Sequence, residues 1–307
     1  MVIRQSIPDL YLQSMLPALD EIIQDRYKRW PPQFPNFFRM RSTNRGIEQT
    51  TEMTGFGQMA VVPEAGAVPY SQPYPAFRQT FLTAQYGLGF KVSRLARDDD
   101  RHGVVNKFAS ELGESALETR EVVAASVFNN GFGDTGPDGV SLFATNHPLV
   151  GPSGGTQTNR AAVAASPDMT SIGLALTDMR QTVDHTGKKK RIPPKQLIVP
   201  SALEFVAATM LGGTDAPDTA NRAINPFRRR SGLPSFDSWA VWDYLTNMNA
   251  WFIQADVSLT ELRFYEQEAF NSIHDVDFDS RTLKTAGWMR FAVGYSAFWG
   301  VYGVYSS

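Results

Sequence analysis

The sequence of 307 residues contains no cysteine, which excludes disulfide bonds, thiol nucleophiles and zinc sites built on thiolates. Histidine is scarce: none of the four has the spacing that zinc proteases use. Charge is also low, at 20% of residues, and nearly balanced, with 29 basic and 31 acidic side chains and a formal net charge of −2. A dedicated nucleic-acid binder carries a basic excess, so that class is disfavoured.

Long hydrophobic runs are missing as well. The N-terminus lacks the apolar stretch of a secretory signal. Residues 291–307 are free of charge but alternate large and small side chains and fall short of the about 20 residues that span a membrane, so we interpret them as strand. These absences predict a soluble, intracellular, globular protein, and its length suggests about two domains.

Two long helices are predicted in the first half of the chain. Residues 9–29 place apolar side chains, among them Leu12 and Leu16, at three- and four-residue spacing until Trp30-Pro31-Pro32 ends the helix. This arm must lay its apolar stripe on its own body or on a neighbour. The acidic residues 98–100 favour the start of a second helix that runs to Asn129, about 45 Å long.

The segment between these helices, residues 51–94, is rich in aromatic, glycine and proline residues and poor in charge. Residues 82–92 alternate apolar and polar side chains, which predicts a strand. We expect residues 56–66 to pair with it in a long hairpin. An isolated hairpin is marginally stable in water, so its apolar face needs a partner, and both its own domain and another subunit can supply one.

The second half of the chain predicts mixed helix and strand. Residues 131–166 and 212–238 read as loops. Helices are expected at 169–184 and, capped by Ser201, at 201–211. Strands are expected at 196–200, 239–245, 250–255, 261–266, 273–279 and 288–305.

Motifs that could carry chemistry are weak. Residues 131–136 spell G-x-G-x-x-G, but a helix precedes them and Pro137-Asp138-Gly139 follows, whereas a dinucleotide site needs a strand before and a helix after. Turn chemistry explains Pro-Asp-Gly without a metal. His147 is expected to hydrogen-bond within its loop. No catalytic residue, metal or cofactor is predicted.

Two basic runs, residues 188–191 and 228–230, have three open interpretations. They are solvated loop charges, non-specific contacts to nucleic acid phosphates, or partners of acidic loops across a subunit boundary. The nearly neutral net charge favours the first.

Three blocks of sequence resemble a known family. They are residues 128–132 with 138–148, Gly154-Gly155 and Asn159; residues 197–204; and residues 242–253. In this order they resemble the major capsid (major head) proteins of tailed bacteriophages, including Mu-like prophages, over most of the chain. The resemblance implies an α+β class and a Hong Kong 97-type capsid fold, with an N-terminal arm, an extended β-hairpin loop, a long spine helix, a peripheral domain and an axial domain.

The layout implied by the resemblance assigns each range a part. Residues 1–35 are the N-terminal arm, 36–166 the peripheral domain with the extended loop at 51–94 and the spine helix at 98–129, 167–270 the axial domain, and 271–307 the C-terminal return to the peripheral domain. Many relatives carry an N-terminal scaffolding segment, and here the arm begins almost at Met1, so scaffolding is expected from a separate protein.

The resemblance implies a structural protein, not an enzyme, that self-assembles as hexamers and pentamers into an icosahedral head. The expected partners are other copies, a scaffolding protein, a portal, a decoration protein and packaged double-stranded DNA bound without sequence specificity, with no membrane. The location is the virion, and the host cytoplasm during assembly. Intersubunit contacts are expected at Glu64, Tyr70, Tyr74, Phe77, Arg78, Leu12, Leu16, Arg228 and Arg229.

The apolar character of arm and loop supports such contacts, because large obligate interfaces are hydrophobic. Two alternatives remain open: an encapsulin-like nanocompartment shell, and a hydrolase using Asp134, Asp138 or His147.

Overall fold

The structure, a computed structural model, describes residues 7–100, 103–151, 154–213, 225, 227, 236, 238–277 and 279–305. For residues 7–14 and for Asp98 only the backbone is described. Arg228 and Arg229 lie outside the described residues.

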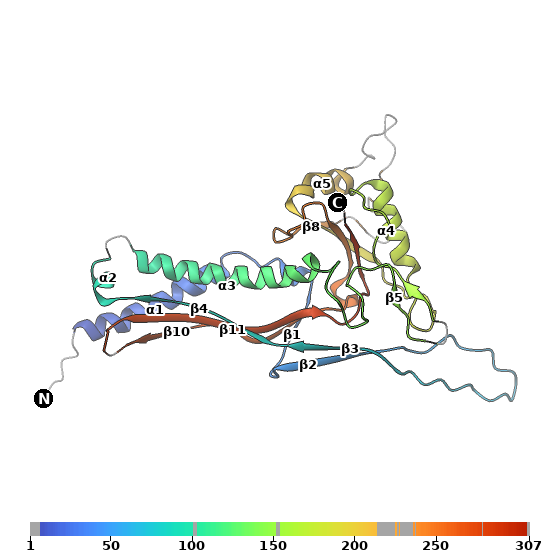
Figure 1. Cartoon of the computed structure of the whole chain (residues 1–307), viewed down its shortest axis with the longest axis horizontal. Helices are drawn as coiled ribbons and strands as arrows, with labels where there is room; N and C mark the ends of the chain where they lie inside the picture. The colour runs from blue at the N-terminus through green and yellow to red at the C-terminus, as the bar shows by residue number, and fades with distance from the viewer. Residues whose placement is uncertain are drawn as a thin grey trace.

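A long sheet with two helices on one face forms the first half of the body (Figure 1). The helices are α1 (Ile7–Lys28) and α3 (Val104–Asn129), preceded by the short α2 (Arg94–Asp98). The strand order is β1 (Arg39–Ser42), β10 (Leu262–Val276), β11 (Leu283–Tyr295) and β4 (Ala84–Val92). At 1.5 Å per residue, the 26 residues of α3 make a rod of about 39 Å that follows the sheet.

The helix expected at 98–129 begins at Val104, because residues 94–98 form the separate helix α2, while the predicted acidic contribution to its start is made by Asp100. Its carboxylate accepts hydrogen bonds from the backbone N–H groups of Val104 (2.9 Å) and Val105 (3.0 Å). It thereby satisfies two of the donors that a helix N-terminus leaves unpaired, with a favourable charge toward the helix dipole.

The second half of the body is a smaller sheet between helices. Its strand order is β12 (Val301–Val304), β9 (Trp251–Ala255), β7 (Pro194–Val199) and β8 (Ser238–Val241). Its helices are α4 (Met169–Gln181) and α5 (Glu204–Gly212), and short 3-10 turns occur at η1 (Phe34–Asn36), η2 (Ser201–Leu203) and η3 (Val257–Leu259). Two further pairs complete the fold: β2 (Ile47–Met53) with β3 (Pro75–Leu82), and β5 (His147–Pro148) with β6 (Thr156–Gln157).

Glu121 of α3 joins the two halves from a buried position, with 2% of its surface exposed. One carboxylate oxygen accepts the backbone N–H groups of Gln33 and Phe34, and the other accepts Trp242 Nε1–H at 3.0 Å. The indole of Trp242 packs against Phe37, with ring centroids 4.5 Å apart. A buried carboxylate is tolerated here because donors satisfy both of its oxygens.

The arm packs on its own body. Leu19 and Ile23 are buried against the core that α3 and the long sheet share, and Leu16 and Tyr27 are partly buried beside them. Leu16 is therefore an internal contact in this chain, while the side chain of Leu12 is not described. The sequence left two surfaces open for the apolar stripe of the arm, its own body or a neighbour. The described side chains of this stripe pack on their own body.

Three strand predictions are corrected by the topology. Residues 84–92 do form a strand, but it pairs with β11 rather than with residues 56–66, which have no regular structure. The strands expected at 261–266 and 273–279 merge into one strand, β10, which runs from Leu262 to Val276 and so crosses the expected boundary at 270. The last strand, β12, joins the smaller sheet, and only β10 and β11 return to the long one.

Smaller differences concern element ends. The expected strand 239–245 stops at Val241, and the next residue, Trp242, donates its indole N–H to Glu121. The helix expected from Ser201 begins as the 3-10 turn η2, and no side chain caps it. None of the described helices is both long enough and apolar enough to cross a membrane.

The crossing of α1 and α3 depends on Gly113. A Cβ atom there would lie 2.4 Å from the carbonyl oxygen of Ile23, which belongs to the backbone of α1 and has little freedom to move. We predict that Gly113→Ala destabilises the unassembled chain by about 1–3 kcal/mol through overpacking, although alanine is the better helix former by about 1 kcal/mol.

Gly173 in α4 is the matched control, because a Cβ there meets nothing within 4 Å. Gly173→Ala should leave the free energy of unfolding unchanged or raise it by up to about 1 kcal/mol. Urea denaturation of both variants measures the difference, and equal stability of the two would contradict the close-packing account.

Candidate subunit interface: the extended loop and its root

The extended loop, defined here as residues 54–74, projects from the body beyond β2 and β3 (Figure 1). Glycine and proline residues at short intervals exclude a regular ladder. At its end the Gly66 N–H donates to the Pro63 carbonyl at 2.9 Å, and Ala65 has a positive φ of 63°, as in a reverse turn. Among the described residues, this is the one hydrogen bond made by residues 57–73.

The loop exposes large apolar side chains. Met59, Val61 and Tyr70 are exposed by 102%, 97% and 96%, and Phe56, Val62 and Val68 are exposed to a lesser degree. Burying apolar surface is worth about 25 cal/mol per Å², and a contiguous exposed apolar patch marks an interaction site. The loop cannot bury these groups on its own chain in this conformation.

The root of the loop, the strands β2 and β3 with their contacts, is fixed by hydrogen bonds and packing. Thr54 and Tyr74 close the ladder: Thr54 N–H donates to the Tyr74 carbonyl, and Tyr74 N–H donates to Thr54 Oγ1, both at 3.1 Å. Phe81 of β3 is buried against Tyr265, with ring centroids 5.1 Å apart. β3 therefore lies against the long sheet, while the loop extends away from it.

A cluster of polar and aromatic side chains connects the root to residues next to the smaller sheet. Glu52 of β2 accepts the Trp299 Nε1–H, and His185 Nε2 lies 3.2 Å from the same carboxylate oxygen. His185 is 2% exposed, and its Nδ1 accepts the Val150 N–H at 3.2 Å.

Lys190 completes this root cluster. Its Nζ lies 3.8 Å from the centroid of the Trp299 ring, a cation–π contact. Burial lowers the pKa of the Lys190 ammonium from its ordinary value, although the nearby carboxylates of Glu52, Glu261 and Asp184 act in the opposite direction. Residues from four separate parts of the chain thus hold one end of the loop.

The sequence-predicted contact residues fall into two groups. Glu64 and Tyr70 are exposed on the loop, where an intersubunit contact stays a prediction. Three others make contacts within the chain: the Tyr74 hydroxyl donates to the Val150 carbonyl at 3.3 Å, the Phe77 ring lies 5.9 Å from that of His185, and Arg78 donates to Gln49. These three belong to the root in this structure.

The glycine motif at 131–136 is a packed turn. The N–H groups of its three glycines donate to the carbonyls of Phe128, Asn130 and Val140, so they are not free to bind a phosphate. A Cβ at Gly131 would lie 2.7 Å from the ring of Phe143, and one at Gly136 would lie 2.4 Å from Tyr295 Oη. Close packing explains these two glycines.

His147 is buried and engaged at both ring nitrogens, as the sequence predicts. Nδ1 lies 2.5 Å from Asp138 Oδ2, Nε2 lies 3.0 Å from Asn159 Oδ1, and the ring stacks on Phe298 at 3.8 Å. An imidazole held in this way has no open position for a substrate. Within the described residues, no three His, Asp or Glu side chains gather as metal ligands would.

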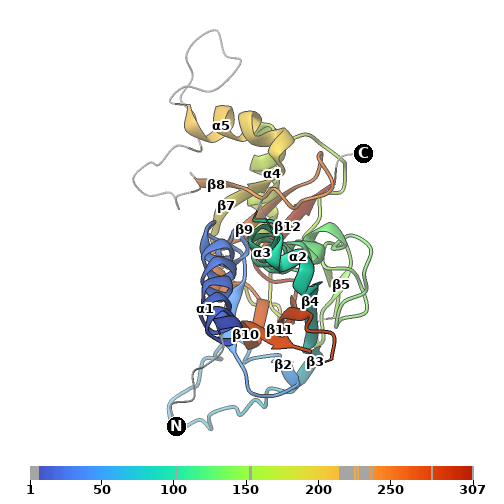
Figure 2. The same ribbon diagram turned by 90° about the vertical axis from the view of Figure 1, so that its left-hand side faces the viewer.

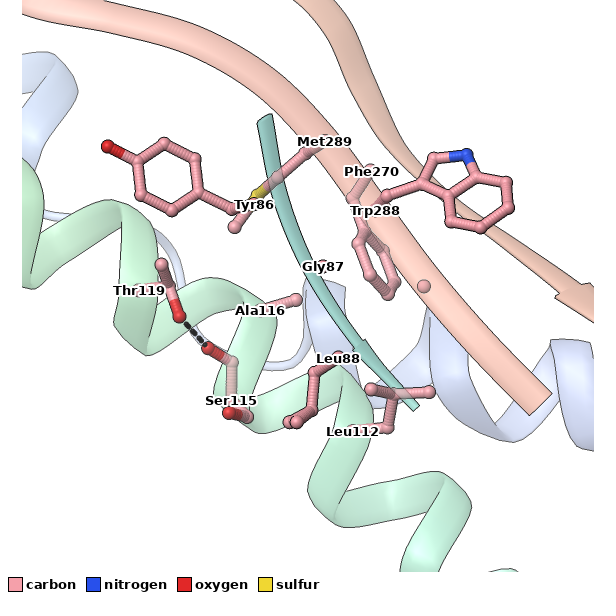
Figure 3. Close-up of a pocket in the computed structure, with 11 residues that line it drawn as sticks. Tyr86, Gly87, Leu88, Leu112, Ser115, Ala116, Thr119, Phe270, Trp288 and Met289 are labelled. Atoms are coloured by element: carbon pink, nitrogen blue, oxygen red, sulfur yellow. Dashed lines mark hydrogen bonds between the residues drawn. The ribbon is translucent and has the colours of Figure 1, made fainter. Parts of the chain in front are cut away.

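A pocket of about 320 Å³ lies between α3 and the sheet strands β4 and β11 (Figure 3). Ala116, Gly87 and Gly287 are among the residues that line it. No carboxylate, His, Lys or Arg lines it, and the Thr119 hydroxyl donates back to the Ser115 carbonyl at 2.7 Å. The pocket has no acid, base or nucleophile pair.

We predict that Glu52→Ala loosens the root, because it leaves the buried Trp299 N–H without its acceptor and removes the carboxylate beside His185. The expected loss is about 1–3 kcal/mol in the free energy of unfolding, with faster proteolysis between residues 54 and 74. Glu52→Gln keeps an oxygen that can accept the Trp299 N–H and should lose less.

Glu64→Ala is the control for this experiment, since it removes an exposed carboxylate and should change stability by no more than about 0.5 kcal/mol. Thermal unfolding and limited proteolysis of the unassembled chain measure both effects. A Glu52→Ala chain as stable and as resistant as Glu64→Ala would show that the cluster does not hold the loop.

Comparison with known proteins adds an independent finding. Residues 78–304 match the model of a family described as phage capsid protein. No curated protein sequence matches the chain.

Three solved structures share the fold at low sequence identity. A chain of Microbacterium phage Oxtober96 matches with a TM-score of 0.58 and 11% identity, over 91% of this chain and 92% of that one. A virus-like particle from Pyrococcus furiosus matches with 0.56 and 7%, over 94% and 98%. The capsid of bacteriophage JBD30, described as decorated with minor capsid protein trimers, matches with 0.53 and 15%, over 70% and 91%.

Proposed function

The chain belongs to the phage capsid protein family, and from that premise we propose that each copy joins the next through its extended loop, building the icosahedral head that encloses double-stranded DNA. The predicted α+β, Hong Kong 97-type fold is confirmed by the structural matches. The protein is a structural component of the virion shell rather than an enzyme.

The observation that carries the proposed route is the extended loop itself. It holds large apolar side chains in solvent at a fixed position, and its backbone donors and acceptors are almost all unpaired within the described chain. The exposed apolar surface is costly in a monomer, while water solvates the backbone groups and leaves them available to pair with another chain. A neighbouring copy removes the apolar cost when it covers the loop.

The geometry favours a ring of copies. The loop extends from one end of the body (Figure 1). A loop that lies on the body of the next copy, and not on that copy's loop, joins two unlike surfaces. A contact between unlike surfaces is heterologous, and heterologous contacts close into rings when the rotation permits. Hexamers and pentamers are such rings, and a shell is assembled from them.

Further partners follow from the family. A scaffolding protein, a portal and non-specific contacts to packaged DNA are proposed for this chain, as is assembly in the host cytoplasm. A decoration protein is proposed as well, supported by the JBD30 capsid, whose description includes minor capsid protein trimers.

A virus-like particle from Pyrococcus furiosus shares this fold, so the fold is not confined to chains described as phage capsids. The fold therefore does not separate a phage head from the encapsulin-like alternative, and the family match favours the phage head. The hydrolase alternative loses its candidate base, because Asp138 and Asn159 occupy both nitrogens of His147.

We predict that replacing residues 56–73 with a short Gly-Ser turn abolishes shell formation while the body stays folded. The replacement keeps β2, β3 and Glu52, so the root cluster remains intact. Electron microscopy of the purified protein reports shells, and circular dichroism with thermal unfolding reports the body. Normal shells from the shortened chain would reject the loop as the link between copies.

A further inference from the structure

A groove on the α1 side of the body is acidic and partly apolar. It has a volume of about 590 Å³ and lies where the end of α1, the middle of α3 and the turn after β8 meet. Four carboxylates line it, at Glu114, Glu118, Glu121 and Asp243, and no basic residue does. Trp30, which is 63% exposed, and Tyr244 supply apolar surface beside them.

Glu118 is the carboxylate in this groove that has no partner within the described chain. Glu121 is buried and fully used, Asp243 accepts from the Gln33 side chain at 2.8 Å, and Glu114 lies 3.5 Å from Arg26. Glu118 is exposed and makes no hydrogen bond or ion pair with a described residue. Burial raises the pKa of the neighbouring Tyr244 hydroxyl, and the negative charges of Glu121, Glu118 and Asp243 raise it further.

The basic run 188–191 presents the opposite charge beside the loop root. Lys188 Nζ donates to the Phe56 carbonyl at 3.1 Å and Lys190 lies on Trp299, so both are used within the chain. Lys189 and Arg191 are exposed and make no ion pair with a described residue. Arg191 lines a hollow of about 270 Å³ with Arg180, and no acidic residue lines it.

The groove and the basic run lie on different sides of the body. Figure 2 places α1 on one side and β5 on the other. The basic run belongs to the β5 side, since the Val183 N–H approaches Gln157 of β6 and His185 binds the Val150 N–H. A molecule with an acidic groove on one side and unpaired cations on another is complementary to a second copy of itself in a head-to-tail arrangement.

We propose that the acidic groove receives Lys189 and Arg191 of the next copy, beside the point where that copy's extended loop leaves its root. This inference rests on the proposed function, because a loop that reaches a neighbour brings its own root to the same neighbour. Complementary charges at this contact favour one orientation of each copy relative to the next, and so the head-to-tail order of copies in a ring.

Charge reversal tests this contact. Glu118→Lys should raise the protein concentration needed for shell assembly by about tenfold or more, because like charges then face each other. Adding Lys189→Glu and Arg191→Glu to the same chain should restore assembly toward the original concentration. Light scattering and electron microscopy of protein purified without DNA measure both, and Glu111→Lys, on α3 outside the groove, is the matched control with normal assembly expected.

The outcomes separate the hypotheses. Normal assembly of Glu118→Lys, with no shells from the loop replacement, would overturn this inference and leave the proposed function standing. Rescue by Arg228→Glu with Arg229→Glu in place of the 188–191 changes would assign the groove to the other basic run and overturn it too. The inference would also be overturned if a chain with Lys189→Glu and Arg191→Glu, and without the Glu118 change, formed shells normally and differed from the original only in retaining less DNA.

Discussion

The extended loop exposes apolar side chains to water, and its sequence prevents it from burying them against its own body. Prolines and glycines prevent the loop from forming a ladder, so it cannot fold back as a strand against the body. Its large exposed groups, such as Met59 and Tyr70, retain an unfavourable contact with solvent until another surface covers them. The free energy of removing these apolar side chains from water therefore both stabilises the loop and drives association of the chains.

An exposed loop is useful for assembly only if its direction is fixed. The root supplies this through two kinds of contact: Phe81 packs on the long sheet, and Glu52 binds Trp299 near the smaller one. Glu121 joins α3, which packs on the long sheet, to Trp242, which follows β8 of the smaller one. Preorganisation of this kind lowers the entropy that is lost on association.

Patterns within one element could be predicted from the sequence, and contacts between distant elements could not. The periodicity of residues 9–29 and the stop at residue 129 locate α1 and α3, since both depend on neighbouring residues. Alternation in 82–92 identifies a strand but not its partner, which is β11, about 200 residues later. Glu52 and Trp299 show the same limit: no local signal connects two residues 247 positions apart. The excess of proline and glycine in 51–94 marks this segment as unusual, yet the strand predicted at 56–66 is irregular in the structure, and the pair that carries the loop is β2 with β3.

Amide hydrogen exchange of residues 56–73, compared between unassembled chains and purified shells, tests the central claim most directly. In the unassembled chain these amides should exchange rapidly, because Gly66 has the one amide of residues 57–73 that donates a hydrogen bond to a described residue. In shells the account predicts slow exchange over the same residues, with little change in the buried strand β9. Equally rapid exchange in both states would show that no neighbour covers the loop, and would contradict the account.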